Sequence, residues 1–395
     1  MNVNKELFLQ YLGQTSPEPL LLNLYKAQGI YLTDTNGKKY IDLISGISVS
    51  NLGHNHEKII SAVKNQLNKY LHLMAYGEYI QSPQVKLAAR LAESLPKNLN
   101  NVFFVNSGSE ANEGALKLAK KFTGRYEIIA CKNAYHGSTI GALSIMGNET
   151  LRKPFLPLMP GVKFISFNNL EDLNGITKNT AAVIIEPVQA EAGVIPGNAK
   201  YIQALEKKCR ETGALMIFDE IQTGFGRTGT LFAFEQYKVK PDILTIAKAF
   251  GGGMPLGAFI SSKKIMGAFS DNPPLSHLTT FGGHPVSCAA AAASLKILQN
   301  SGIIREVKEK EEIFHNQLKH PAIKEIRSRG LLIALEFERP DFVKKLLQKL
   351  LMKGIICDFF LFNNKALRIA PPLIIKKKEI KEVCRLINAA IDKTN

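Results

Sequence analysis

A lysine between a strand-like segment and a glycine-rich loop is the residue of this sequence best suited to covalent chemistry. Lys248 follows the strand-like segment 242–246 and precedes the glycines at 251–253. Apolar surroundings disfavour the ammonium form of lysine, and the neutral amine can form an imine with a carbonyl compound. Because a lone lysine more often carries its charge to the surface, the interpretation depends on which residues come near it.

The segment 106–112, Asn-Ser-Gly-Ser-Glu-Ala-Asn, could bind an anion. It follows a strand expected at 102–105, and Ser107 with Glu110 fits the capping box of a helix N-terminus. Backbone N–H groups at such a terminus, beside Gly108 and Ser109, bind phosphate readily. An ordinary capped helix explains the same residues equally well.

Two acidic segments and one aromatic segment follow other expected strands. Tyr135 and His136 precede Gly137 after strand 127–131 and could line a flat ligand, although a surface turn is equally plausible. Glu186 comes directly after strand 181–185, where we favour a role in orienting neighbours over acid–base catalysis. Asp219 ends the apolar run 215–218, so it should be partly buried and paired with a cation, most simply an arginine of the protein.

These features together predict a site for pyridoxal phosphate. A lysine in an apolar pocket, an acid on a neighbouring strand, an aromatic loop and an anion-binding helix terminus are the parts that hold this cofactor. Lys248 would form the Schiff base, and Asp219 would pair with the protonated pyridine nitrogen. The resulting pyridinium accepts the electrons of the carbanion formed on deprotonation.

The order of the expected elements predicts how these residues meet. From residue 102 to 261 strands alternate with helices, which is typical of a largely parallel sheet covered by helices on both faces. Ligands of such sheets lie beyond the carboxyl ends of the strands. A hairpin at 30–42 around Asn36-Gly37 precedes this region, and an α+β unit follows it. We expect three segments: 1–65, the N-terminal part of a small domain; 66–285, a large cofactor-binding domain; and 286–395, the C-terminal part of the small domain.

Composition narrows the possible partners. The 395 residues are 45% hydrophobic and carry a net charge of +16, with lysines dispersed except at 376–378 and 381. Dispersed charge attracts acidic small molecules as well as nucleic acid, and we expect no nucleic-acid binding. No signal peptide or membrane span is recognisable. Five scattered cysteines without metal-ligand spacing indicate reduced thiols, a cytoplasmic location and no metal site.

In order along the chain, these motifs resemble the class III, fold-type I pyridoxal-phosphate-dependent aminotransferases of the ornithine, acetylornithine, putrescine and 4-aminobutyrate group. The resemblance covers about residues 20–390. It depends on Gly53-His54, 106–112, 135–137, 186–191, 219–227, 247–249, 280–283 and 368–372. It implies an α/β fold with a large, mostly parallel sheet and a small α+β domain formed by both chain ends.

The resemblance also implies roles for matching residues. Lys248 holds the cofactor and later shuttles a proton, Asp219 keeps the pyridine nitrogen protonated, Gln222 lies near the phenolic oxygen, and Tyr135 stacks on the ring. Thr280 reaches the phosphate of the neighbouring subunit's cofactor, which implies a homodimer with sites at the subunit interface. The other expected cofactor-binding residues are Ser107, Gly108, Ser109, His136 and Glu186.

Substrate binding is expected at Glu191, Arg368 and Ser138. Glu191 and Arg368 resemble a gated pair that opens so that the arginine binds the α-carboxylate of 2-oxoglutarate, because a guanidinium matches a carboxylate bidentately. Ornithine- and acetylornithine-type members usually have arginine where Ser138 stands, and segments 151–157 and 271–283 resemble the putrescine branch. The expected reaction moves the terminal amino group of an acetylornithine- or ornithine-like amino acid, or of a diamine such as putrescine, to 2-oxoglutarate by a ping-pong mechanism.

Two alternatives stay open at this point. An aminomutase of the glutamate-semialdehyde type would shift the amine within one molecule, and amino transfer to added 2-oxoglutarate separates the two. A basic binding protein with a vestigial site would be colourless and bind its partner in a salt-dependent manner.

Overall fold

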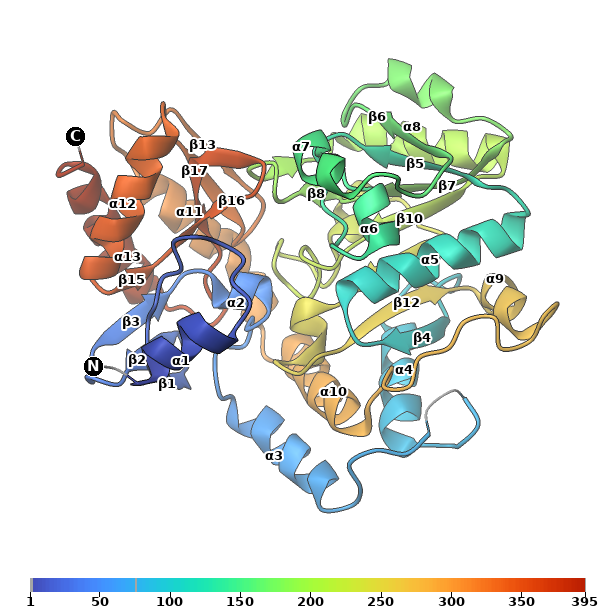
Figure 1. Cartoon of the computed structure of the whole chain (residues 1–395), viewed down its shortest axis with the longest axis horizontal. Coiled ribbons are helices and arrows are strands. Elements are labelled where there is room, and N and C mark those ends of the chain that lie inside the picture. Colours follow the sequence, from blue (N-terminus) through green and yellow to red (C-terminus); the bar gives the residue numbers. More distant parts are fainter. Residues whose placement is uncertain (1–2, 75–76, 395) are drawn as a thin grey trace.

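The computed structural model describes residues 3–74 and 77–394, and its centre is a seven-stranded sheet (Figure 1). The strand order is β4, β12, β11, β10, β7, β5, β6. Neighbours are parallel except β12, which is antiparallel to both β11 and β4. The bounds are β4 Asn101–Val105, β5 Glu127–Cys131, β6 Val162–Ile165, β7 Thr180–Ile185, β10 Leu215–Asp219, β11 Ile243–Ile246 and β12 Gly257–Ser261.

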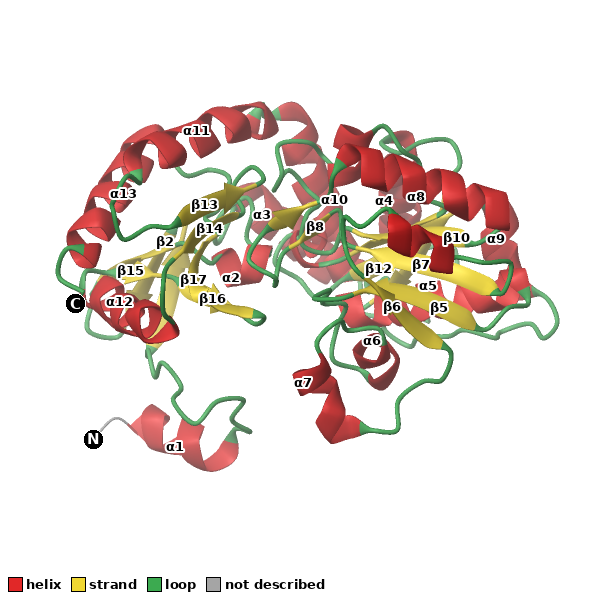
Figure 2. Ribbon diagram, turned by 90° about the horizontal axis from the view of Figure 1, so that it is seen from above, coloured by secondary structure: helices red, strands yellow, loops and turns green. Residues whose placement is uncertain are grey.

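Helices cover both faces of this sheet, as the sequence predicted. Every residue of β5, β7, β10, β11 and β12 is buried, which explains their continuous apolar sequences. Figure 2 shows α5 on one face and α8 on the other. The helices of this region are α4 Ser82–Glu93, α5 Gly108–Thr123, α6 Ile140–Ser144, α7 Glu149–Arg152, α8 Ala199–Thr212, α9 Lys263–Met266 and α10 Pro285–Asn300.

Both chain ends contribute to a second, smaller α+β region, where the blue and red segments of Figure 1 lie side by side. Strand β15 pairs in parallel with β3, extending the sheet β1-β2-β3-β15. A further sheet has the order β13-β14-β17-β16. The bounds are β1 Leu24–Gln28, β2 Tyr31–Asp34, β3 Lys39–Asp42, β13 Glu325–Ser328, β14 Ile333–Glu336, β15 Ile355–Ile356, β16 Asp358–Phe360 and β17 Asn363–Ile369. The helices are α1 Val3–Tyr11, α2 Ser45–Ser48, α11 Val307–Gln317, α12 Pro340–Met352 and α13 Lys377–Ile391. Helix α3, Glu57–Leu67, lies outside this region and packs against α10.

The prediction of an α/β fold with a small domain formed by both chain ends is confirmed. The hairpin expected at 30–42 is present as β2 and β3, with Gly37 in the left-handed region at φ 81°. The division at residues 65 and 285 stays a prediction.

Two helices end or break inside longer helical apolar patterns. Helix α3 ends at Leu67, although the apolar period continues to the exposed Leu71. The apolar pattern at 304–318 is divided between a 3-10 turn, Ile303–Glu306, and α11. Helix α1 was not predicted; its Leu7, Leu9 and Tyr11 are exposed, so it has no buried apolar face of its own.

Arg227 ties the loop after β10 to both chain ends. Its guanidinium donates to the carbonyl oxygens of Leu331 and Pro371 at 2.8 and 2.6 Å, to Asn51 Oδ1 at 2.5 Å and to Ser45 Oγ at 3.1 Å. Burial lowers the pKa of Arg227 to about 9, and the negative charge of Asp42 opposes part of this shift. These bonds pair the two terminal nitrogens of a buried cation with neutral oxygens and join segments far apart in sequence, while Arg227 Nε has no hydrogen-bond partner among the described residues.

The described residues contain no helix that is long and apolar enough to cross a membrane. The five cysteines are free thiols, and four of them are buried.

Candidate active site

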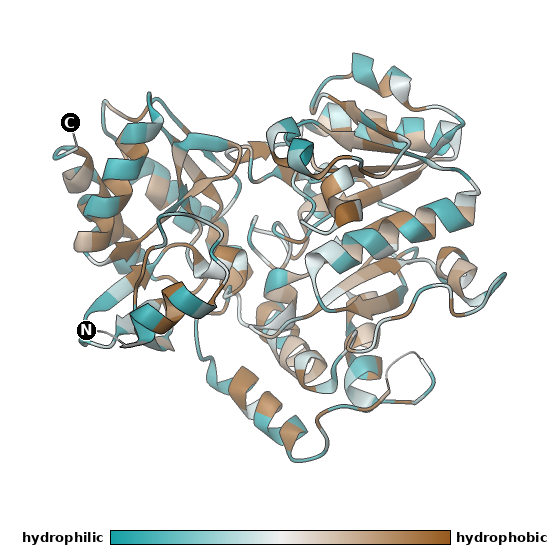
Figure 3. Cartoon of the chain, in the orientation of Figure 1, coloured by the Kyte–Doolittle hydropathy of each residue, from teal (hydrophilic) through white to brown (hydrophobic). Residues whose placement is uncertain are grey.

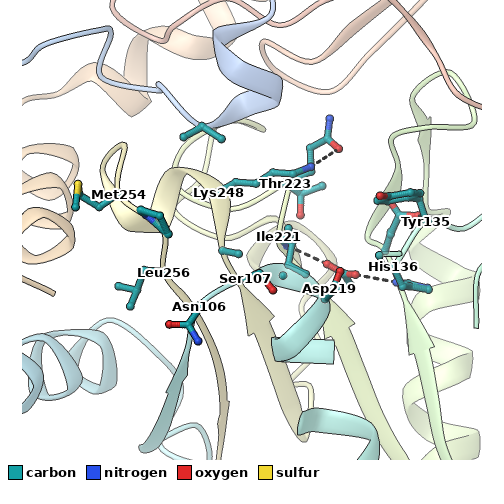
Figure 4. A pocket seen from close by; sticks show the side chains of 18 of the residues that line it. Asn106, Ser107, Tyr135, His136, Asp219, Ile221, Thr223, Lys248, Met254 and Leu256 are labelled. Atoms are coloured by element: carbon teal, nitrogen blue, oxygen red, sulfur yellow. Dashed lines mark hydrogen bonds and ion pairs between the residues drawn. The ribbon is translucent and has the colours of Figure 1, made fainter. Parts of the chain in front are cut away.

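A cavity of about 440 Å³ lies at the carboxyl ends of the central strands and brings most of the predicted residues together (Figure 4). The start of α5 and the loops after β5, β7, β10 and β11 form its walls, as expected for a parallel sheet. Its lining residues are Val49, Asn106, Ser107, Gly108, Ser109, Tyr135, His136, Gly137, Glu186, Asp219, Ile221, Gln222, Thr223, Ala247, Lys248, Gly253, Met254, Pro255 and Leu256.

Lys248 extends into this cavity from the first position of a 3-10 turn, Lys248–Gly251. Its backbone φ of 49° lies in the left-handed region, which a residue other than glycine adopts only when the surrounding structure enforces it. The Nζ atom donates to Gln222 Oε1 at 2.9 Å. Burial lowers the pKa of Lys248; the Glu191 carboxylate opposes this shift and the Arg368 guanidinium adds to it. The amine is thereby brought closer to its neutral, nucleophilic form.

Asp219 ends β10 and is only 4% exposed. Its Oδ2 accepts from His136 Nδ1 at 2.7 Å and from Asn112 Nδ2 at 2.8 Å, and its Oδ1 accepts from the backbone N–H of Ile221 at 3.0 Å. The simpler alternative, an arginine of the protein as partner, is not found among the described residues, and Arg227 contacts the segments of the two chain ends instead. A histidine and an amide occupy that place.

The helix start at Ser107 forms the predicted cap with one difference. Ser107 Oγ accepts from the backbone N–H of Glu110 at 3.2 Å, while the Glu110 carboxylate accepts from the backbone N–H of Asn106 at 2.8 Å, one residue earlier than in a standard capping box. The first helical turn, at Gly108 and Ser109, has N–H groups without partners inside the helix. These groups face the cavity end where an anion would bind.

Gly137 allows the loop after β5 to lie against this helix start. Its φ is 131°, and a Cβ atom there would lie 2.2 Å from Ser109 Oγ. The neighbouring Ser138 N–H donates to Ser109 Oγ at 3.3 Å. The aromatic loop and the helix start therefore form one continuous wall.

Glu186 holds the aromatic loop in place. Its Oε1 accepts from the backbone N–H of Tyr135 at 2.9 Å, and its Oε2 accepts from that of Ala190 at 3.2 Å. Burial raises the pKa of Glu186 well above its usual range, and the charges of Asp219 and Glu191 raise it further. These contacts support an orienting role for the carboxyl group.

Glu191 and Arg368 form a buried ion pair next to the cavity. Arg368, on β17, places Nη2 2.6 Å from Glu191 Oε2 and donates to the carbonyl oxygen of Phe359 at 3.0 Å. The same Glu191 oxygen accepts from the backbone N–H of Leu361 at 3.1 Å. Within the described chain, Arg368 Nε and Nη1 are buried without a hydrogen-bond partner. Neither side chain lines the cavity itself, but both charges act on Lys248.

Two further predicted site residues lie outside the cavity of this chain. Ser138 is exposed, with its hydroxyl 3.2 Å from the Tyr135 hydroxyl. Thr280 is also exposed, in the irregular segment between the 3-10 turn Gly267–Ser270 and α10. Neither lines the cavity.

Three residues at or behind the cavity were given no role from the sequence. Asn112 was part of the motif 106–112 but received no role. The only sequence signal was its position five residues after the N-cap residue Ser107, on the first turns of the helix. Ile221 lies against Gly108, where a Cβ atom would meet its Cδ1 at 2.9 Å. Val49 comes from the N-terminal region and gives no local signal.

The residues present fit pyridoxal phosphate. Lys248 Nζ, a buried carboxylate at Asp219 and the α5 terminus lie around one cavity. Gln222 Nε2 and His136 Nε2 are buried there without a partner in the described residues, which leaves polar atoms for a ligand.

The fold and the site define the class of protein, and comparison with known proteins agrees. Residues 12–391 match the family "Aminotransferase class-III", so the chain belongs to this family. It is a pyridoxal-phosphate-dependent aminotransferase of fold type I.

Individual members of this class are similar to the chain over nearly its full length. The chain is 40% identical to an acetylornithine aminotransferase of Methanocaldococcus jannaschii, with 98% of this chain and 96% of that protein covered. It is 38% identical to a [LysW]-aminoadipate semialdehyde/glutamate semialdehyde transaminase of Sulfolobus acidocaldarius, covering 94% and 95%. Among solved structures, the ornithine aminotransferase from Toxoplasma gondii ME49 superposes with a TM-score of 0.91 at 30% identity, covering 98% and 94% of the two chains.

Proposed function

We propose that this aminotransferase moves the terminal amino group of an ω-amino compound to 2-oxoglutarate in a ping-pong reaction. The observation that carries the proposal is the Arg368 guanidinium. It is buried beside Lys248 with two nitrogens unpartnered among the described residues, and its one carboxylate partner, Glu191, lies on a loop. A buried cation with spare donors is suited to bind a carboxylate.

Each residue of the site has a separate role in the proposed amino transfer. When bound, pyridoxal phosphate supplies a carbonyl for condensation with amines and a ring that accepts the electrons released on C–H cleavage. The Lys248 amine, once free, takes the proton from the carbon that bears nitrogen and later returns one. Asp219 would hold the pyridine nitrogen protonated, and Tyr135 would cover the ring. Ser107, Gly108 and Ser109 would hold the phosphate.

Glu191 and Arg368 would let one pocket accept two kinds of substrate. With the pair closed, the positive charge is neutralised and an amine-bearing chain without a carboxylate at that position can bind. With the pair open, Arg368 can bind the α-carboxylate of the acceptor. The pair is closed in this structure, at 2.6 Å.

The amino donor is proposed as an acetylornithine- or ornithine-like amino acid or a diamine such as putrescine. Two relatives, at 40% and 38% identity, are acetylornithine aminotransferases. Ser138 has a neutral hydroxyl at the rim, so a donor carboxylate would need another cation there.

A donor panel tests the proposal. Acetylornithine, ornithine, putrescine, lysine and 4-aminobutyrate are each incubated with 2-oxoglutarate, and glutamate formation is measured. We expect glutamate with at least one of the first three. Absence of glutamate with all five, together with conversion of glutamate semialdehyde without an acceptor, would favour the aminomutase instead.

We also propose that the enzyme is a homodimer. Thr280 is exposed in its own chain, and it lies among exposed apolar residues, with Leu278 and Phe281 47% and 55% exposed. Nearby Ile80 is 96% exposed, next to a groove lined by Tyr79, Val85 and Phe104. A second copy would cover this surface and place Thr280 near the partner's cofactor.

A further inference from the structure

Two fully buried side chains lie behind Asp219 and are connected to it by hydrogen bonds. Asn112 is on α5 and Thr245 on β11, and neither lines the cavity. Thr245 Oγ donates to Asn112 Oδ1 at 2.8 Å, and Asn112 Nδ2 donates to Asp219 Oδ2 at 2.8 Å. Asn112 Nδ2 also donates to the carbonyl oxygen of His136 at 2.7 Å.

The direction of these bonds is determined by chemistry. The Asp219 carboxylate and the His136 carbonyl can only accept, so the amide nitrogen of Asn112 must face both. The amide oxygen then faces Thr245, whose hydroxyl must donate. If the amide were reversed, its oxygen would face two acceptors. The hydrogen bond from the Thr245 hydroxyl therefore stabilises this orientation of the Asn112 amide over the reversed one.

This orientation fixes the geometry of Asp219. Asn112 and His136 both donate to Oδ2, from α5 and from the loop after β5 respectively. The backbone N–H of Ile221 holds Oδ1 at 3.0 Å. With Oδ2 occupied from two sides, the carboxylate has a fixed plane, and Oδ1 keeps a free lone pair for a partner in the cavity.

We propose that Asn112 and Thr245 are positioning residues for the cofactor, acting through Asp219. The Thr245 hydroxyl locks the Asn112 amide, and that amide holds the Asp219 carboxylate in the orientation that receives the pyridine N–H. This inference rests on the role of Asp219 within the proposed function. Neither residue touches the cofactor, so their effect appears in how tightly and in which protonation state the cofactor is held.

The first test replaces the hydroxyl with an isosteric methyl group. Thr245→Val should weaken the binding of pyridoxal phosphate to the apoprotein about tenfold, as expected when an orienting hydrogen bond to a charged network is lost. The dissociation constant is measured by absorbance titration. The pH titration of the bound cofactor's absorption should also shift, and Thr245→Ser should restore both quantities.

Thr180→Val is the matched control. Thr180 is a buried threonine of the same sheet whose hydroxyl donates to Glu127 Oε1 at 2.6 Å, away from the cavity. Its loss should leave cofactor affinity unchanged. Thermal melting of each apoprotein shows whether a variant folds, and Asn112→Ser, which shortens the side chain, is the second variant should Thr245→Val melt early.

A double-mutant cycle shows whether the effect acts through Asp219. In an Asp219→Asn background, Thr245→Val should cause little further loss of cofactor affinity. An unchanged dissociation constant in Thr245→Val, or an equal loss in both backgrounds, overturns the inference. The donor panel with wild-type enzyme is a separate measurement, so a failure of the proposed function is recognised independently.

Discussion

Lys248 illustrates how backbone and burial prepare a single amine for reaction. Its left-handed φ and the glycines that follow turn the chain so that the side chain enters the cavity. Burial lowers its pKa, and Gln222 Oε1 accepts its hydrogen bond. A lowered pKa increases the fraction of neutral amine at any given pH below it.

Lys248→Ala should abolish steady-state transamination. The variant loses both the covalent link and the proton-transferring base, each of which contributes orders of magnitude to rate. Borohydride treatment followed by peptide mapping should fix cofactor to residue 248 in the wild type only. Retained turnover in the variant would refute the assignment, and Lys263→Ala, on the exposed surface, serves as the control.

Arg368→Lys should separate the two half-reactions. Lysine keeps the charge but lacks the bidentate fork, so we expect KM for 2-oxoglutarate to rise by about tenfold or more. The half-reaction with the amino donor should change much less, because it does not need Arg368 to bind a carboxylate. Single-turnover measurements of each half-reaction check this, and equal losses in both would argue against the acceptor role.

At the scale of elements, the central sheet was predictable because its strands are continuous apolar runs ended by polar residues. Asp219 and Glu186 were found in that way, since each directly follows a buried run. The partner of Asp219 was not predictable, because His136 comes from another strand end and Asn112 from a helix. The position of Val49 depends on the packing of the small region, which no local pattern encodes. For the same reason the pair of Glu191 with Arg368 was indicated only by resemblance to a family.

Arg227→Lys should destabilise the joint between the loop after β10 and the chain ends. A lysine ammonium cannot reach the four oxygens that the guanidinium contacts, so buried acceptors lose their partners at a cost of about 2–4 kcal/mol. Chemical denaturation measures this loss. Arg210→Lys, whose side chain is 76% exposed, should have almost no effect. Equal stability of the two variants would show that the joint is dispensable.

At the scale of the whole molecule, each chain holds most of its own site, while Thr280 and the apolar surface around it face outward. This arrangement fits a dimer in which each subunit completes the other's site. The sequence could indicate Thr280 only by resemblance, because a contribution to a second chain leaves no mark on local structure.

Mixed dimers test the shared site. Thr280→Val and Lys248→Ala should each have low activity alone. Co-expressed dimers that contain one chain of each kind should recover about half of the wild-type activity, because one of the two sites is then intact in a symmetric assembly. Differently tagged subunits allow isolation of the mixed species. No recovery in isolated mixed dimers would show that Thr280 serves its own chain.

The pairing of β3 with β15 has a consequence for how the protein is made. Beside these strands, Lys38 Nζ donates to the carbonyl oxygen of Met352, a residue 314 positions later in the chain. During translation the N-terminal hairpin therefore leaves the ribosome long before its partner strand exists. The central sheet can form from contiguous sequence meanwhile, but the Arg368–Glu191 pair, and with it the proposed acceptor site, can close only after residue 368 has left the ribosome.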